Sequence, residues 1–286
     1  MTGSADLVTD EVRALIALAL DEDLRYGPDI TTMATVPADA VADAAIVSRA
    51  HGVVAGVPVA RAVFDAVIGA GRYEVATELA DGTRVAPGDT VLALRAPTRE
   101  LLTAERTALN LLCHLSGIAT ATAAWVDAVD GTKAEIRDSR KTLPGLRSLQ
   151  KAAVRAGGGV NHRMGLGDEA LIKDNHVAAV GSVAAALQAV RATAPDIPVE
   201  VEVDSLDQLD EVLALAPSLV LLDNFPLWAT QMAVSRRDAR SPSTKLESSG
   251  GLTLEVAADY AKTGVDYLAV GALTHSVAVL DLGLDM

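Results

Sequence analysis

The chain has 286 residues, of which 50% are hydrophobic and 22% charged, so a disordered protein is excluded and a sizeable core can form. The formal net charge of −14 disfavours nucleic acid and anionic lipid as partners, and a single cysteine excludes a disulfide scaffold. The first residues lack the features of a signal peptide, and no uncharged apolar run reaches the roughly 20 residues that span a bilayer. We therefore expect a cytoplasmic protein without nucleic-acid or membrane partners.

The N-terminal part of the sequence mixes helical and strand patterns. Apolar residues at helical spacing predict a helix over 9–24. A strand, a glycine turn and a second strand are predicted over 41–59. A long helix is predicted over 99–129, with a break near Ser116. This alternation indicates a separate α+β unit that ends near residue 115.

From about residue 130, short strand-like runs alternate with helical runs. The predicted strands are 134–138, 169–174, 199–204, 219–223, 245–249 and 267–271. Such a β/α series predicts a parallel sheet with helical crossovers, and six legible strands favour a closed or nearly closed barrel. In parallel α/β folds, ligands bind at the carboxyl ends of the strands, so we expect the functional side chains there.

Positive charge is concentrated in one part of this acidic chain. Residues 132–176 contain nine lysines and arginines and five acidic residues, a local sum of +4. Arg140, Arg163 and Lys173, with His162 beside them, would repel one another in a closed pocket unless an anion lay between them. The cluster therefore predicts a site for a small, multiply charged anion. A basic helix face is the alternative interpretation.

Acidic and glycine-rich segments follow the later strands. Glu202 and Asp223 lie near the ends of predicted buried strands and offer the oxygen ligands that Mg²⁺ prefers. The glycines of ESSGGL (247–252) and VGALTH (270–275) precede helices, where main-chain N–H groups can hold a phosphate. Arg137, in contrast, is expected to pair at a loop surface with the aspartates of this region, Asp138, Asp168 and Asp174.

Eight motifs carry a resemblance to a known family. They are LDEDLRYGPDITT, TAERTALNLLCHLSGIAT, DSRKTLPGLR, GGGVNHRMGLGDEALIKDNH, VEVEVDSLDQ, LLDNF, ESSGGL and VGALTHS. In their order and spacing, nearly the whole chain resembles the quinolinate phosphoribosyltransferase family. Ser139 is a mild departure, because the family commonly has DTRKT where this chain has DSRKT. This departure puts no site residue in doubt.

The resemblance implies both a fold and a reaction. The implied fold is an open seven-stranded α/β barrel over 116–275 and an N-terminal α+β sandwich over 1–115, on which the tail 276–286 packs. The implied enzyme is a homodimer, and the partner's N-terminal domain completes each active site. With Mg²⁺, it would convert quinolinate and phosphoribosyl pyrophosphate into nicotinic acid mononucleotide, pyrophosphate and CO₂, a step of de novo NAD biosynthesis.

The resemblance also assigns roles to the candidate site residues. The implied quinolinate ligands are Arg140, His162, Arg163, Lys173 and, from the partner subunit, Arg106. The implied phosphoribosyl pyrophosphate ligands are Lys141, Ser249, Gly250, Gly251, Gly271 and His275. The implied metal ligands are Glu202 and Asp223, and these two form the catalytic set together with Lys141 and Lys173.

Three other functions stay open beside this one. The acceptor could be nicotinate or another pyridine carboxylate. Lys173 could form a Schiff base in a barrel lyase. The chain could also be a non-catalytic module that binds small anions.

Overall fold

The computed structural model describes residues 7–286, which form two compact units. The first unit contains the residues up to 123 together with 143–158 and 276–286, and the second contains 124–142 and 159–275. The boundary therefore lies at 123/124, and the segment 143–158 joins the first unit. The predicted boundary at 115/116 falls inside one continuous helix, because the long predicted helix crosses from one unit into the other.

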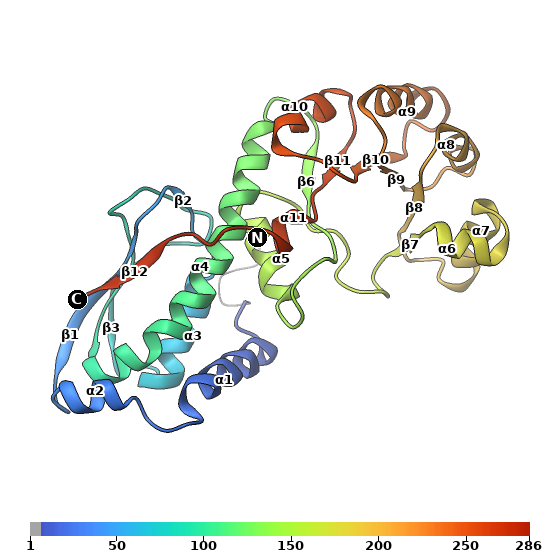
Figure 1. Cartoon of the computed structure of the whole chain (residues 1–286). Coiled ribbons are helices and arrows are strands. Elements are labelled where there is room, and N and C mark those ends of the chain that lie inside the picture. The colour runs from blue at the N-terminus through green and yellow to red at the C-terminus, as the bar shows by residue number, and fades with distance from the viewer. Residues whose placement is uncertain (1–6) are drawn as a thin grey trace. The chain divides into compact units, whose positions relative to one another are not determined.

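The first unit is built on a four-stranded antiparallel sheet in the order β12-β1-β5-β3 (Figure 1). The C-terminal strand β12 pairs with β1, so that Ala45 lies opposite Asp285. The elements of this unit are α1 (Asp10–Leu24), α2 (Ile30–Thr35), β1 (Val41–Ser48), β2 (Gly52–Val53), α3 (Val57–Ile68), β3 (Glu74–Glu78), β4 (Arg84–Val85), β5 (Thr90–Pro97), α4 (Thr98–Ala128), α5 (Arg147–Ala156) and β12 (Leu282–Asp285). The last turn of α4 belongs to the second unit.

Two helices of the first unit differ from the predicted pattern. The predicted strand over the end of 41–59 is wrong there, because α3 begins at Val57. This helix is apolar on most of its surface and largely buried, so the sequence shows no clear helical stripe. The predicted break near Ser116 is also wrong, since α4 continues through it. Instead, Ser116 Oγ accepts a hydrogen bond from the main-chain N–H of Ala55, with 3.0 Å between the nitrogen and the oxygen.

Helix α4 is long and apolar because it packs inside the first unit. A Cβ on Gly117 would overlap the main chain at Ala278, and a Cβ on Gly157 would overlap the main chain at Ala119, so the glycines allow close approach. By length and composition, α4 is the one helix among residues 7–286 that could cross a membrane, and 56% of that apolar window is buried in the protein. A buried core helix has the same composition, so this is weak evidence for a membrane span.

The second unit contains a six-stranded parallel sheet in the order β6-β11-β10-β9-β8-β7. Its elements are β6 (Glu135–Arg137), β7 (Ala170–Ile172), α6 (Asp174–Val180), α7 (Val183–Thr193), β8 (Val199–Val203), α8 (Leu206–Leu213), β9 (Leu219–Asp223), α9 (Leu227–Arg240), β10 (Lys245–Ser249), α10 (Leu254–Lys262), β11 (Tyr267–Ala269) and α11 (Ala272–His275). Beyond β6, Val160 adds a single parallel bridge to Arg137, where a seventh strand would pair. The predicted α/β class and parallel series are confirmed.

Successive side chains along a strand point to opposite faces of the sheet, which separates core residues from site residues. In β8, Val199, Val201 and Val203 are buried, while Glu200 and Glu202 project to the opposite face. Figure 1 shows α8, α9 and α10 along the outer side of these strands. Valine packing against the helices thus leaves the glutamates on the inner face of the sheet.

Candidate functional site

The polar residues predicted at the strand ends lie where the sequence indicated. Arg140 and Lys141 follow β6, Lys173 follows β7, Asp223 ends β9 and Ser249 ends β10. Parallel pairing brings the ends of β9 and β10 together, because Asp223 lies opposite Ser249. The carboxyl edge of the second unit therefore gathers cations, carboxylates and glycine turns.

The glycine turn after β10 is shaped by its neighbour at the end of β9. Gly250 has φ +92°, and a Cβ there would overlap Oδ1 of Asn224. The main-chain N–H of Asn224 donates to the carbonyl of Ser249 at 2.8 Å. Gly251 also has positive φ, at +61°. Side chains at these two positions would be strained, so the turn leaves main-chain N–H groups accessible at the start of α10.

The turn after β11 lies against the lysine that follows β6. A Cβ on Gly271 would contact Lys141 Cδ at 3.2 Å and His275 Nε2 at 3.4 Å. Thr274 Oγ1 donates to the carbonyl of Lys141 at 2.8 Å, which fixes the lysine main chain. Lys141, Gly271 and His275, all predicted ligands of phosphoribosyl pyrophosphate, are therefore neighbours.

Arg140 and Arg163 come close enough to repel each other. Burial lowers the pKa of Arg163, and the charge of Arg140 lowers it further. In each side chain, Nε–H is buried and has no hydrogen-bond acceptor among the residues 7–286. A buried donor without an acceptor is costly, and two of them on like charges indicate a binding site for an anion.

Lys173 and Glu202 form an ion pair between the end of β7 and β8. Asp223 Oδ2 accepts a hydrogen bond from the side chain of Asn224 at 2.9 Å. The side chain of Glu202 is 17% exposed, so its carboxylate is accessible to a ligand. Two carboxylates near the edge supply only oxygen donors, and this donor set fits Mg²⁺.

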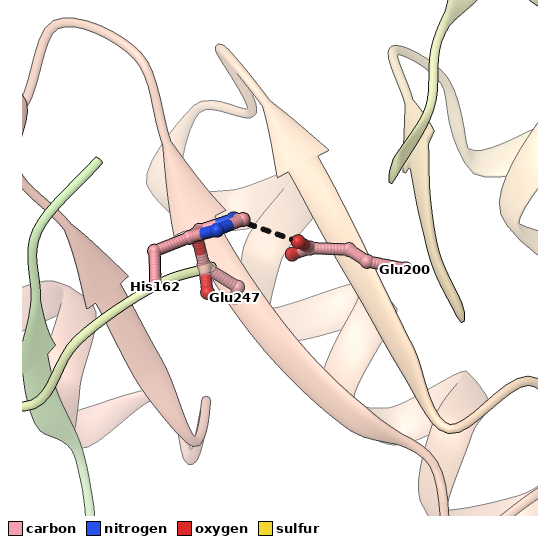
Figure 2. Close-up of side chains that lie close together, drawn as sticks. All are labelled: His162, Glu200 and Glu247. Atoms are coloured by element: carbon pink, nitrogen blue, oxygen red, sulfur yellow. Dashed lines mark ion pairs between the residues drawn. The ribbon is translucent and has the colours of Figure 1, made fainter. Parts of the chain in front are cut away.

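A buried charged cluster lies inside the second unit, around Arg137. Its Nη1 donates to Glu247 Oε2 at 2.6 Å, and its Nη2 donates to Glu169 Oε2 at 3.3 Å. Glu200 Oε1 is 4.0 Å from the same guanidinium, and His162 Nε2 is 2.8 Å from Glu200 Oε2. Figure 2 shows the His162 ring facing the Glu200 carboxylate, with Glu247 beside it. The predicted pairing of Arg137 with aspartates at a loop surface is wrong, because its acidic partners are the glutamates of this cluster and lie in the interior.

The two glutamates of this cluster are held in an unfavourable environment. Both side chains have 0% exposure. Burial raises the pKa of Glu200 to about 7 and also raises the pKa of Glu247 to about 7, and the neighbouring charge of Glu200 adds to the shift of Glu247. Near neutral pH the pair therefore exists in part as carboxylic acids.

We expect the stability of Glu247→Gln relative to the wild type to increase as the pH rises. The folded-state pKa of Glu247, about 7, lies above its unfolded value of 4.5. Below pH 4.5 the group is protonated in both states, and stability is lost as the pH rises toward 7 because the unfolded chain releases the proton that the buried group retains. A shift of this size corresponds to on the order of 3 kcal/mol.

Urea unfolding of both proteins near pH 5 and near pH 8 measures this effect. Arg137 keeps Glu169 and Glu200 as charge partners in the variant, so the arginine is not left alone. A difference in unfolding free energy that stays the same at both pH values would contradict the prediction.

A cavity of about 600 Å³ borders the same cluster. Its lining includes His162 and Arg163 together with Pro198, Ser218 and Lys245, which lie at the amino ends of β8, β9 and β10. The sequence predicted a site at the carboxyl ends of the strands and did not predict this cavity at their amino ends. The segment that carries Arg163 therefore borders the interior of the second unit as well as the strand ends.

The remaining predicted site residue belongs to the first unit. Arg106 lies on α4 and is exposed. Near the predicted site, His176 has a clear local role, because its Nδ1 accepts the main-chain N–H of Lys173 at 3.0 Å. This contact indicates that His176 orients the main chain of Lys173.

Together, the fold and the site define an α/β enzyme with an edge suited to a multiply charged anion, phosphate and a divalent metal. The chain belongs to the quinolinate phosphoribosyltransferase family. The family's N-terminal domain matches residues 29–116, and its C-terminal domain matches residues 118–285.

Named relatives and solved structures agree with this membership. The chain is 66% identical over 282 residues to the nicotinate-nucleotide pyrophosphorylase [carboxylating] of Mycobacterium leprae, covering 99% of both chains. It is 38% identical to the probable enzyme of that name from Bacillus subtilis, covering 93% of this chain and 90% of the relative. The structure of the nicotinate-nucleotide pyrophosphorylase from Francisella tularensis matches with a TM-score of 0.89 and 36% identity, covering 96% of each chain.

Proposed function

We propose that this protein transfers the phosphoribosyl group of phosphoribosyl pyrophosphate to quinolinate and removes CO₂, giving nicotinic acid mononucleotide and pyrophosphate. This reaction is a step of de novo NAD biosynthesis. The observation that carries the proposal is the pair Arg140 and Arg163, whose buried Nε–H donors have no acceptor among residues 7–286. A dianion such as quinolinate supplies both the charge and the acceptors that this pair needs.

The quinolinate carboxylates bind to Arg140 and Arg163, with Lys173 as a third cation. Lys173 then exchanges its contact with Glu202 for a substrate carboxylate. Arg106 reaches the site from the partner subunit of a homodimer. The cations fix the pyridine ring so that its nitrogen points at the ribosyl carbon, and positioning of this kind lowers the barrier of the transfer.

The phosphoribosyl pyrophosphate lies along the glycine turns. The residues that hold its phosphates are Lys141, Ser249, Gly250, Gly251, Gly271 and His275. Because Lys141 lies against Gly271, one lysine can neutralise charge that develops on the departing pyrophosphate. Glu202 and Asp223 would hold Mg²⁺, which supplies positive charge to the pyrophosphate.

The bond changes need no covalent protein intermediate. The ring nitrogen forms a bond to the ribosyl carbon as the bond from that carbon to pyrophosphate breaks. The 2-carboxylate then leaves as CO₂, and its bonding electrons remain on the ring carbon next to the positively charged nitrogen, where a proton replaces the carboxyl group. The protein's part is to orient both substrates and to stabilise the charges.

We further propose that the enzyme works in the cytoplasm without nucleic-acid or membrane partners. The acidic composition and the single cysteine support this location. Dimerisation is supported by the exposed position of Arg106, because an exposed arginine is available to a second copy.

The reaction itself is the test. Purified protein is incubated with quinolinate labelled in the 2-carboxylate, phosphoribosyl pyrophosphate and Mg²⁺, and both CO₂ and nicotinic acid mononucleotide are measured. We expect both products to form together and to disappear when either substrate or Mg²⁺ is omitted. Turnover of nicotinate without CO₂ would instead identify a different acceptor, and borohydride trapping with a carbonyl substrate would identify a Schiff-base lyase. Binding of both ligands without product would identify a non-catalytic module.

A further inference from the structure

His162 makes contacts within the protein through both ring nitrogens. Its Nδ1 accepts the main-chain N–H of Arg163 at 2.7 Å. Its Nε2 lies 2.8 Å from Oε2 of Glu200, a side chain with 0% exposure, while the His162 side chain is itself only 6% exposed. The imidazole therefore lies between a buried carboxylate and the main chain of a predicted substrate ligand.

The first of these contacts determines where the ring carries its proton. A main-chain N–H can only donate, so Nδ1 must be unprotonated. The neutral ring then carries its hydrogen on Nε2, which faces Glu200 (Figure 2). Donor atoms of His162, Glu200 and Glu247 lie within 4.8 Å of one another, as in a metal site. A protonated Nε2 has no lone pair for a metal, so the hydrogen bond from the Arg163 main chain to Nδ1 favours a protein-internal role for this histidine.

Arg163 is held at both its main chain and its side chain. Its Nη1 donates to the carbonyl of Glu169 at 2.9 Å, and the Glu169 carboxylate is held by Arg137 at 3.3 Å. Between these supports, the Nε–H of Arg163 is buried and has no acceptor among the described residues. The contacts to His162 and Glu169 thus hold the main chain and the guanidinium of Arg163, while its Nε–H is left for a ligand.

We propose that His162 is a positioning residue: its Nδ1 fixes the main chain of Arg163, and its ring lies against buried Glu200, so that Arg163 directs its Nε–H at a substrate carboxylate. This inference rests on the proposed function and assigns His162 a different role from the direct quinolinate contact that the family resemblance implies. The side chain that contacts the substrate is Arg163, and His162 acts only through it.

Two substitutions at His162 separate its two nitrogens. In His162→Asn, the amide oxygen takes the place of Nδ1 and can still accept the Arg163 N–H. In His162→Gln, the longer amide reaches toward Glu200 but leaves the Arg163 N–H without that acceptor. We expect His162→Gln to raise the quinolinate KM about 10- to 100-fold, as a small misplacement of a binding group does. We expect His162→Asn to stay within about threefold of the wild type, and the phosphoribosyl pyrophosphate KM to change little in either variant.

A double-mutant cycle with Arg163→Ala shows whether His162 acts through Arg163. If it does, His162→Gln adds less than about a twofold change once Arg163 is alanine, because coupled residues are not additive. The same pair of substitutions at the exposed His51 serves as the control for changing a histidine, and we expect no effect there. Thermal unfolding of every variant shows which proteins are folded before kinetics are compared.

Two results would overturn the inference. Equal losses in His162→Asn and His162→Gln that add in full to the Arg163→Ala loss would make His162 a direct substrate contact. Unchanged quinolinate kinetics in both variants would remove it from the site. Should His162→Gln not fold, His162→Leu fills a similar volume without either nitrogen and makes the same comparison. Unchanged kinetics in Arg163→Ala alone would instead overturn the ligand role of Arg163 in the proposed function.

Discussion

Replacing Arg163 by alanine should lower kcat/KM for quinolinate by about 100-fold, because a charge-assisted hydrogen bond of about 1.5–3 kcal/mol is lost. The guanidinium is partly buried and lies near Arg140, which strengthens its interaction with a dianion. The KM for quinolinate should rise, and turnover should fall as the ring nitrogen loses its alignment. The kcat/KM of Arg163→Lys should lie between those of the wild type and Arg163→Ala, because lysine keeps the charge and loses the planar guanidinium.

Steady-state kinetics with each substrate varied in turn measure this effect. Arg240→Ala is a matched control, since it also removes one arginine. Arg240 lies at the exposed end of α9, where it pairs with the half-buried Asp210. Such a surface pair contributes little, so its kinetics should equal those of the wild type. Should Arg163→Ala raise only the phosphoribosyl pyrophosphate KM, this arginine would belong to the phosphate site instead.

The series of strands and the location of the site were predictable because they depend on local pattern. Each strand of the second unit is a short run that is followed by a helical run, and parallel pairing brings the strand ends to one edge. Asp223 beside Ser249 and Lys141 beside Gly271 follow from that rule. The roles of these residues came from the resemblance to a family, whose membership the comparisons confirm.

The buried charges were not predictable in the same way. The alternation in VEVEV indicates that Glu200 and Glu202 share a face. It does not predict that the Glu200 side chain is 0% exposed while the Glu202 side chain remains accessible. That difference depends on Arg137 and Glu247, which are distant in sequence and meet Glu200 only in the folded unit. Likewise, the role of Ser116 in an unbroken α4 depends on a bond to Ala55.

The ion pair between Lys173 and Glu202 connects the two halves of the proposed site. Lys173 is a predicted ligand of quinolinate, and Glu202 is a predicted ligand of the metal. This ion pair must break before Lys173 can bind quinolinate or Glu202 can bind the metal. Binding of quinolinate and binding of Mg²⁺ are therefore expected to favour each other, because each ligand releases the residue that the other uses.

For this reason, Glu202→Ala should have two separable effects. Loss of one of the two edge carboxylates should raise the Mg²⁺ concentration needed for half-maximal turnover, by about tenfold, and lower the maximal rate. At the same time, Lys173 no longer has to break its ion pair with Glu202 before it binds quinolinate, so the quinolinate KM should not rise. Activity measured over a titration of Mg²⁺ at saturating substrates, followed by quinolinate kinetics at saturating Mg²⁺, separates the two.

Two further variants decide between a metal role and a purely structural one for Glu202. Asp204→Asn removes a charge from the neighbouring exposed acid and should leave the Mg²⁺ titration unchanged. Glu202→Gln keeps an oxygen for Lys173 but loses the charge, so it should resemble Glu202→Ala in its metal dependence. If Glu202 serves only to hold Lys173, the outcome reverses: the metal titration stays the same, and the quinolinate KM rises because the lysine is no longer oriented. The direction of the quinolinate KM thus distinguishes a carboxylate that binds metal from one that only orients its neighbour.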